Sequence, residues 1–151
     1  MSVYENLKNH GYEIPKALSP AGLYVPVNQT GNLLYLSGQG SICQGRPLAG
    51  KVGVNMSVEE GREAAKVSML NTLGALEAYL GDLNKIKRVV KILGFVACGD
   101  DFTQQADVIN GASQVLLDVF GENGRHARSA IGTNSLPLGL AVEIESIFEI
   151  I

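Results

Sequence analysis

One stretch of the chain, from about Ile86 to Cys98, constrains the possible fold more than any other. Alternate residues of a strand point to opposite faces of a sheet, so the two faces of this stretch can be considered separately. From Val89 onwards both are apolar apart from one lysine, Lys91: Val89, Leu93, Phe95 and Ala97 share one face, and Val90, Ile92, Gly94, Val96 and Cys98 share the other. This pattern is typical of a central strand that is covered on both sides.

Two amphipathic helices flank this stretch. Ser57 and Glu60 have the spacing of a capping box and predict the start of the first helix, and Gly81 predicts its end. The pair Asp100-Asp101 favours a second helix soon after the strand, because acidic residues stabilise a helix N-terminus, and Gly121 closes it. Apolar residues recur at spacings of three and four in both helices: Ala65, Met69, Leu73, Leu76 and Leu80 in the first, and Val108, Ala112, Val115, Leu116 and Val119 in the second.

The remaining extended runs predict a mixed sheet. Runs at 23–27 and 33–38 are joined by one turn, and runs at 128–134 and 140–148 are joined by another and could pair as a hairpin. A glycine-rich loop follows the second run and has room for a short strand near Ile42. Strand–helix–strand connections favour parallel neighbours with right-handed crossovers. The expected fold class is therefore α+β, a mixed β-sheet with two helices packed on one face.

The whole chain, residues 1–151, is expected to form a single domain. It has no linker, repeat or low-complexity segment. Residues 1–20 are expected to be an N-terminal edge segment, because they are polar and because Pro15 and Pro20 limit regular structure. Two helices can cover only one face of a sheet of about five strands. Because the central strand is apolar on both faces, we expect a homo-oligomer to cover the second face.

Charge and hydropathy exclude several classes of protein. The net charge is −3, and the isoelectric point is near 5.3. Nucleic acid is therefore not expected as a partner, since a general nucleic-acid binder shows a basic patch. No apolar run is long enough to span a membrane, and the N-terminal residues contain no signal-peptide core. The two cysteines, Cys43 and Cys98, lie far apart in the sequence and suggest reduced thiols and a cytoplasmic location.

Several familiar sites find little support in the sequence. The glycines between Gly38 and Gly45 are not followed by a Gly-Lys-Ser/Thr ending or directly by a helix, so turns are a better interpretation than a phosphate-binding loop. The histidines, His10 and His126, lack the spacing of metal ligands, and Cys43 and Cys98 form no Cys-x-x-Cys motif, so no metal is expected. His126 has no acidic neighbour and is better explained as a surface or interface residue than as a catalytic base.

Two charged positions carry more information. Arg128 lies in the extended run Ala127-Arg-Ser-Ala-Ile131, which alternates as a strand should, so its guanidinium faces one side of a largely apolar sheet. A charge there is costly unless paired, and the planar guanidinium suits a carboxylate or a phosphate. Glu143 and Glu145 share a face of the last run, and a hairpin would bring Glu143 and Arg128 towards one pocket. A structural salt bridge explains Arg128 equally well, so these residues alone leave the function open.

Six short motifs occur together and in a fixed order between about residues 20 and 148: Gly22-Leu-Tyr24, Leu36-Ser-Gly-Gln39, Asn110, Ala127-Arg-Ser129, Leu136-Pro137 and Val142-Glu-Ile-Glu145. In this combination the chain resembles the RidA/YjgF family, also called the L-PSP endoribonuclease family, whose fold is chorismate-mutase-like. It is more similar to a longer branch that carries the endoribonuclease label, through Asn-Gly-Ala-Ser at 110–113 and Gly-Arg-His-Ala-Arg-Ser-Ala at 124–130.

The resemblance implies both an assembly and a reaction. The assembly is a homotrimer with clefts between its subunits, and the reaction is the hydrolysis of reactive 2-imino or enamino acids to 2-keto acids and ammonia. No metal or organic cofactor is implied, and the only other partner is a small carboxylate-bearing substrate. By motif, Arg128 corresponds to the arginine that holds the substrate carboxylate, and Glu143 to the glutamate that positions or activates water. Tyr24, Ser37 and Asn110 correspond to other pocket positions.

The chain departs from the family pattern in ways that bear on its substrate. Ala130 stands where active relatives commonly carry cysteine, and Leu23 replaces the usual proline. The segment 102–110 is about three residues longer than in the short branch, and Arg125 and His126 add positive charge. Besides the deaminase, two alternatives therefore stay open: an endoribonuclease, and a non-catalytic trimer that binds a small carboxylate.

Overall fold

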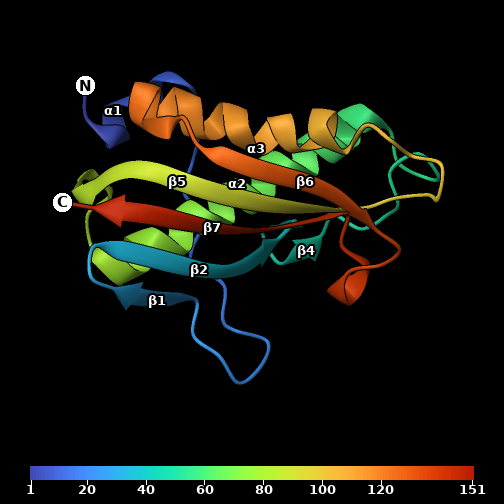
Figure 1. The fold of residues 1–151 in the computed structure, drawn as a ribbon, viewed down its shortest axis with the longest axis horizontal. Helices are drawn as coiled ribbons and strands as arrows, with labels where there is room; N and C mark the ends of the chain where they lie inside the picture. The colour runs from blue at the N-terminus through green and yellow to red at the C-terminus, as the bar shows by residue number, and fades with distance from the viewer.

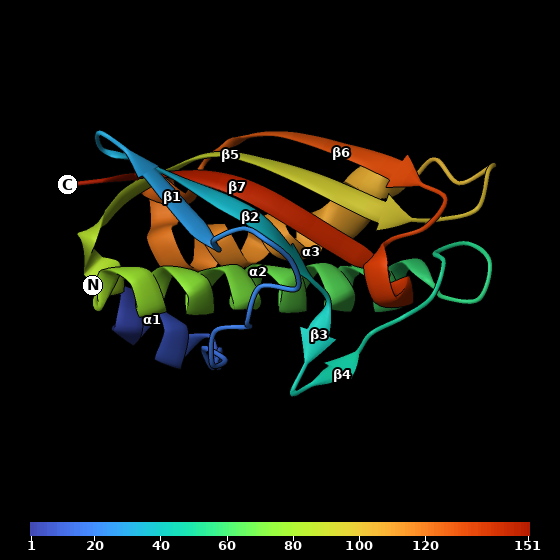
Figure 2. The same cartoon turned by 90° about the horizontal axis from the view of Figure 1, so that it is seen from below.

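In a computed structural model, residues 1–151 form a five-stranded mixed sheet with two long helices against one face (Figures 1 and 2). This arrangement agrees with the α+β architecture expected from the sequence. In chain order the elements are α1 (Val3–Asn9), β1 (Val27–Thr30), β2 (Leu33–Gly40), β3 (Ile42–Cys43), β4 (Arg46–Pro47), α2 (Val58–Leu80), η1 (Leu83–Lys85), β5 (Ile86–Ala97), α3 (Gln105–Phe120), η2 (Gly121–Gly124), β6 (Ala127–Thr133), η3 (Pro137–Gly139) and β7 (Val142–Ile150).

The strand order is β1-β2-β7-β5-β6, and only β5 and β6 run parallel. The expected hairpin between the last two strands is therefore wrong, because β5 lies between β6 and β7. Strand β5 pairs along most of its length on both sides, which suits a strand with two apolar faces. The segment 134–141 crosses the end of β5, and its eight residues easily span two strand spacings of about 4.8 Å each.

The predicted boundaries of the first long helix are confirmed. Ser57 and Glu60 form the reciprocal capping box at the start of α2, and Gly81 ends it with a left-handed φ of 78°. Gly121 also ends α3 as expected, but α3 begins at Gln105 rather than directly after the acidic pair. The intervening residues form a turn in which the Phe102 amide donates to the Gly99 carbonyl, 3.1 Å away. This turn places the Phe102 ring against the core.

The N-terminal region differs from expectation in two places. Residues 3–9 form the short helix α1, with a capping box between Ser2 and Glu5 and with Val3 and Leu7 buried. The predicted strand at 23–27 is largely absent, because β1 begins only at Val27. The residue before it, Pro26, has no N–H to donate to a strand ladder. The residues that precede Pro26 form an exposed loop, seen at the bottom of Figure 1.

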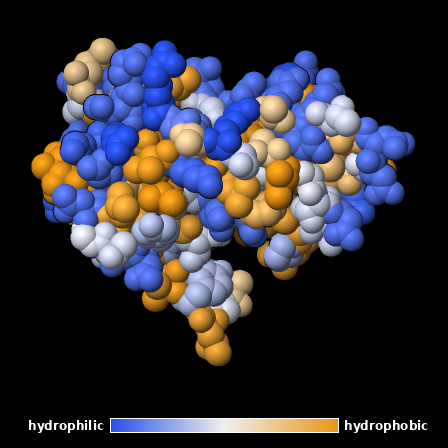
Figure 3. All heavy atoms as spheres, viewed as in Figure 1, coloured by the Kyte–Doolittle hydropathy of each residue, from blue (hydrophilic) through white to orange (hydrophobic).

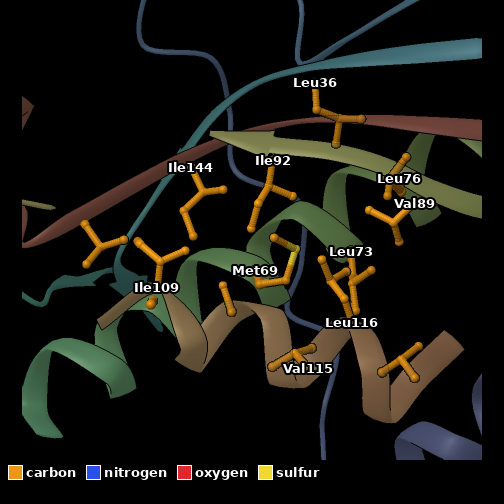
Figure 4. Packing of buried hydrophobic residues seen from close by; sticks show 14 of the residues in the cluster. Leu36, Met69, Leu73, Leu76, Val89, Ile92, Ile109, Val115, Leu116 and Ile144 are labelled. Carbon is orange, nitrogen blue, oxygen red and sulfur yellow. The ribbon is translucent and has the colours of Figure 1, made fainter. Parts of the chain in front are cut away.

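The core lies between the sheet and the two long helices. Figure 4 shows side chains from α2, α3 and the sheet meeting in this layer. The periodic residues predicted for the two helices are buried there, apart from Leu80, which is partly buried at the end of α2. In β5 an irregularity between Val89 and Lys91 shifts the alternation, so Val89 and Ile92 both face the helices.

The opposite face of the sheet is uncovered. Figure 3 views the molecule from this side and shows hydrophobic side chains over the strands. Tyr35 and Ile131 are 45% and 46% exposed, and Leu93 and Phe95 of β5 are half-buried. No helix of the structure is both long enough and apolar enough to cross a bilayer. The uncovered apolar face is the physical basis for expecting an oligomer.

Close packing between the two long helices depends on Gly111. A Cβ at this position would lie 2.1 Å from the carbonyl oxygen of Arg62 in α2, so the backbones would have to separate. Alanine favours a helix over glycine by about 1 kcal/mol, but overpacking against backbone costs about 3 kcal/mol. We expect Gly111→Ala to lower the free energy of unfolding by about 2 kcal/mol, measured by urea unfolding at a fixed protein concentration.

Gly81→Ala is the matched control for this prediction. A Cβ at Gly81 would meet no atom within 4 Å, and only the left-handed backbone, with φ of 78°, opposes the change. Its expected cost is about 1 kcal/mol. A loss in Gly111→Ala no larger than in Gly81→Ala would contradict the close approach of α2 and α3.

Candidate functional site

Arg128 lies on the edge strand β6, and its guanidinium reaches over α3. Nη1 donates to the Asn110 side-chain oxygen at 2.8 Å and to the Ser113 hydroxyl oxygen at 3.0 Å, and Nη2 donates to the Ala106 carbonyl oxygen at 2.9 Å. The three acceptors lie on one face of α3, at spacings of four and three residues. All three are neutral, and Arg128 forms no ion pair within the chain.

The hydrogen bonds leave part of the Arg128 guanidinium free. An arginine has five N–H groups, and the contacts to α3 use both on Nη1 and one on Nη2. The Nε–H group and one Nη2–H group make no hydrogen bond within the chain. Two N–H groups are the number that a carboxylate takes in a bidentate pair. Arg128 is therefore a fixed cation with capacity for one anionic ligand, and the structural salt bridge allowed by the sequence is absent.

Ser113 was not among the predicted site residues, although it lies in the 110–113 motif. Its hydroxyl oxygen is 2.9 Å from Nε2 of His126, and Nδ1 of His126 is 2.6 Å from the Gly124 carbonyl oxygen. Ser113 lies three residues after Asn110 and therefore on the same face of the helix, and this spacing could have identified it from the sequence. The two branch motifs, at 110–113 and 124–130, thus meet in one hydrogen-bonded network around Arg128.

Glu143 occupies a different part of the molecule. It lies on β7 against Gly38, where a Cβ would be 2.7 Å from the carboxylate oxygen Oε2 of Glu143, so only glycine leaves room for this side chain. Burial raises the pKa of Glu143 above its ordinary value of 4.5, and the negative charge of Glu145 raises that pKa further. A carboxylate at Gly38 also disfavours a phosphate there. The expected turns are absent at Gly38 and Gly40, which lie in strand β2, whereas Gly45, with a φ of 78°, lies in the turn between β3 and β4.

Glu143 and Tyr24 line a cavity of about 370 Å³ between the exposed loop and the η3 turn. In Figure 3 it is a hollow beside the loop at the bottom of the molecule. Much of its wall is apolar and comes from Leu18, Pro20, Pro26, Ile42, Pro137, Leu138 and Leu140. The Tyr24 hydroxyl oxygen accepts a hydrogen bond from the Ala21 amide at 3.2 Å, and the ring is half exposed. The cavity therefore offers a carboxylate and an apolar surface to a small molecule.

Ser37 supports this cavity indirectly. Its hydroxyl donates to the Val25 carbonyl oxygen at 2.7 Å, and its amide donates to the Pro26 carbonyl oxygen at 2.9 Å. These bonds attach the exposed loop, which carries Tyr24, to strand β2. Ser37 itself lines a different depression on the open face of the sheet, together with Lys91 and Glu145.

The structure does not bring Arg128 and Glu143 together within one chain. Directly paired residues on neighbouring strands share a face, and Arg128 pairs with Ile92, whose side chain is in the core. Glu143 pairs with Phe95, three residues further along β5 and on the opposite face. The expectation that they lie near one pocket is therefore wrong for a single chain. Each chain carries two half-sites: Arg128 with Asn110 on the helix side, and Glu143 with Tyr24 on the open side.

The other candidate ligands do not cluster. Nowhere do three or more His, Cys, Asp or Glu side chains gather in a way that could hold a metal ion. Cys43 is exposed and Cys98 is buried, and neither forms a disulfide. His10 contacts Asp118 at 3.7 Å, whereas His126 belongs to the Arg128 network.

Residues 5–147 match the family model described as "YjgF/chorismate_mutase-like, putative endoribonuclease". The chain belongs to the RidA/YjgF family. Among its relatives, Protein TCP17 from Trypanosoma cruzi is 42% identical over 150 residues, which cover 98% of this chain and 94% of that protein. The 2-iminobutanoate/2-iminopropanoate deaminase of Dermatophagoides farinae is 31% identical over 138 residues, which cover 88% of this chain and 90% of the relative.

A solved structure with the same fold matches nearly the whole chain. The crystal structure of Atu1372 from Agrobacterium tumefaciens, whose function is described as unknown, is 44% identical and superposes with a TM-score of 0.91, covering 99% of this chain and 92% of that one. The superposition therefore includes the segments that carry Arg128 and Glu143, as well as the N-terminal helix.

Proposed function

We propose that the chain forms a trimeric enzyme that hydrolyses 2-imino acids to 2-keto acids and ammonia. The observation that carries the proposal is Arg128, a fixed cation with only neutral partners and with two free N–H groups. This arrangement suits the carboxylate of a small acid. The deaminase name of the Dermatophagoides relative, at 31% identity over most of both chains, supports the choice of reaction.

The trimer is part of the proposal because one chain holds only half-sites. The open face of the sheet is apolar and uncovered, so packing of this face against other copies would bury it. In the proposed trimer, the Arg128 edge of one subunit lies against the Glu143 cavity of its neighbour, and each cleft combines both half-sites. Light scattering after size-exclusion chromatography should give three times the mass of the 16.0 kDa chain.

The proposed reaction adds water to the imine carbon. Arg128 holds the carboxylate next to that carbon, and the Glu143 carboxylate accepts a proton from the attacking water. The water oxygen then forms a bond to carbon, and the imine nitrogen becomes an amine. When the carbon–nitrogen bond breaks, Glu143 returns its proton to the nitrogen and the new hydroxyl group releases its own proton to water, so ammonia leaves and the 2-keto acid remains. Protonated imines are reactive, so orientation and one base supply enough catalysis.

The direct test uses 2-iminobutanoate and 2-iminopropanoate generated in the cuvette by an amino-acid oxidase. Wild-type protein should accelerate imine loss in proportion to its concentration. Arg128→Ala should lower kcat/KM at least about 100-fold, because it removes carboxylate binding. Arg125→Ala is the matched control, since Arg125 is exposed and pairs only with Glu122. An unchanged rate of imine loss with wild-type protein, over both substrates, would refute the deaminase.

Two other functions predict different results in the same experiments. The substitution of the usual cysteine by Ala130 favours a non-catalytic trimer, which would bind 2-oxobutanoate tightly without turnover of the imine. The description of the family model favours an endoribonuclease. Cleavage of RNA by rigorously purified protein, lost in Arg128→Ala and retained in Arg125→Ala, would support that activity over the deaminase.

A further inference from the structure

The hydrogen bonds of His126 have a defined direction. A carbonyl oxygen only accepts hydrogen bonds, so the 2.6 Å contact with the Gly124 carbonyl places a proton on Nδ1 of His126. In the neutral ring, Nε2 is then an acceptor, and it lies 2.9 Å from the Ser113 hydroxyl oxygen. The Ser113 hydroxyl can therefore donate to Nε2 while its oxygen accepts the Nη1–H of Arg128 at 3.0 Å. Each group in this chain of bonds has a matching partner.

The backbone next to His126 packs closely against α3. A Cβ at Gly124 would lie 2.1 Å from the Leu116 carbonyl oxygen, so the chain here passes directly over α3. The His126 ring is anchored to this segment and half-buried beside Ser113. Of the three acceptors of Arg128, Ser113 is the one that links α3 to the segment entering β6. The bond that the Ser113 hydroxyl donates to Nε2 of His126 fixes which way this hydroxyl points.

Arg128 needs such support because of its place in the fold. It lies on an edge strand, and an arginine side chain has about 2 kcal/mol of rotamer entropy to lose when it is held in one geometry. The Asn110 side chain is itself exposed on α3 and gives only weak restraint. A bidentate carboxylate pair requires the guanidinium plane to be correctly oriented before the substrate arrives.

We propose that Ser113 and His126 are positioning residues, which hold the Arg128 guanidinium so that its free Nε–H and Nη2–H groups face the substrate carboxylate. The proposal rests on the proposed function for its substrate, but the orientation of Arg128 can be measured without any ligand. Ser113 acts directly on Arg128, and His126 acts only through Ser113. Ser113 belongs to the branch motif at 110–113 and His126 to the one at 124–130, so each motif supplies one of the two positioning residues.

The first measurement follows the Arg128 side chain by ¹⁵N–¹H NMR in the ligand-free full-length protein. In the wild type, the hydrogen bonds that Nη1 of Arg128 donates to Asn110 and Ser113 should give its N–H groups a resolved signal with slow exchange. Ser113→Ala and His126→Ala should each broaden or shift this signal. Ser113→Thr should leave it as in the wild type, because threonine keeps the hydroxyl. Arg125→Ala, the neighbouring control, should leave it unchanged. An unaltered Arg128 signal in His126→Ala would overturn the proposal whether or not the protein hydrolyses imines.

The second measurement is the kinetics of imine hydrolysis. Ser113→Ala and His126→Ala should raise KM about tenfold and change kcat less than about twofold, because carboxylate binding is impaired and the water-activating side is intact. The double variant should be no worse than Ser113→Ala alone, since both residues act through one bond. Strictly multiplicative effects would contradict that coupling. Labelling of Ser113 by a fluorophosphonate would show a nucleophile and would also overturn the positioning role.

Discussion

Glu143→Gln is expected to lower kcat/KM for 2-iminobutanoate by about 10²–10⁴-fold while leaving the protein folded. The amide keeps the shape of the side chain against Gly38 but cannot accept a proton from water, and general-base catalysis contributes an effect of this size. Imine loss above the uncatalysed rate is the measurement. Retention of more than about a tenth of wild-type kcat/KM would exclude Glu143 as the proposed base.

The role of Glu143 as a base also predicts how the rate of imine hydrolysis changes with pH. The base works only when ionised, so the rate should fall as the pH drops through the pKa of Glu143. Burial first, and the charge of Glu145 second, raise that pKa above 4.5, so the acid limb should lie above the pH expected for an ordinary glutamate. Glu145→Gln removes the neighbouring negative charge and is the matched variant. It should move the limb to lower pH and leave the rate on the plateau unchanged.

Local signals predicted the parts of the fold that depend on neighbouring residues. The capping box at Ser57, the terminating glycines and the periodic apolar residues of both helices all depend on contacts within a few residues, and the structure confirms them. Helix α1 has the same capping-box pattern at Ser2 and Glu5, so the start of this helix could have been predicted from the sequence. Pro15 and Pro20 led instead to the prediction of an edge segment over residues 1–20, although both prolines lie beyond the helix.

Strand pairing was harder to predict because it depends on distant residues. A short connection between two strands favours a hairpin, but β5 competes for both neighbours with a longer apolar surface. The same error affected the candidate site. Motifs identified Arg128 and Glu143 as candidates, but only the strand register shows that their side chains lie on opposite faces. Ser113 was missed because its spacing from Asn110 becomes informative only once both side chains are known to contact Arg128, and those contacts depend on the fold.

The second large effect follows from the positions of Arg128 and Glu143 on opposite faces of the sheet. It is a recovery of activity in mixed trimers. If each cleft takes Arg128 from one subunit and Glu143 from the next, Arg128→Ala and Glu143→Gln homotrimers are both inactive for different reasons. In a mixed trimer, one junction pairs an intact Arg128 with an intact Glu143. Random mixing in equal amounts makes about three quarters of the trimers mixed, each with one intact cleft of three. Activity should then return to about one quarter of wild type.

The experiment needs subunit exchange, so the two variants carry different tags and are refolded together, and trimers with both tags are isolated. Each variant refolded alone is the control and should stay inactive. Isolated mixed trimers should reach about one third of wild-type kcat with wild-type KM, because their single cleft is unaltered. A cleft built within one chain predicts no recovery, since every subunit would still carry one substitution. Recovery therefore depends on the opposite orientations of Arg128 and Glu143 across the sheet, which a single chain cannot reconcile.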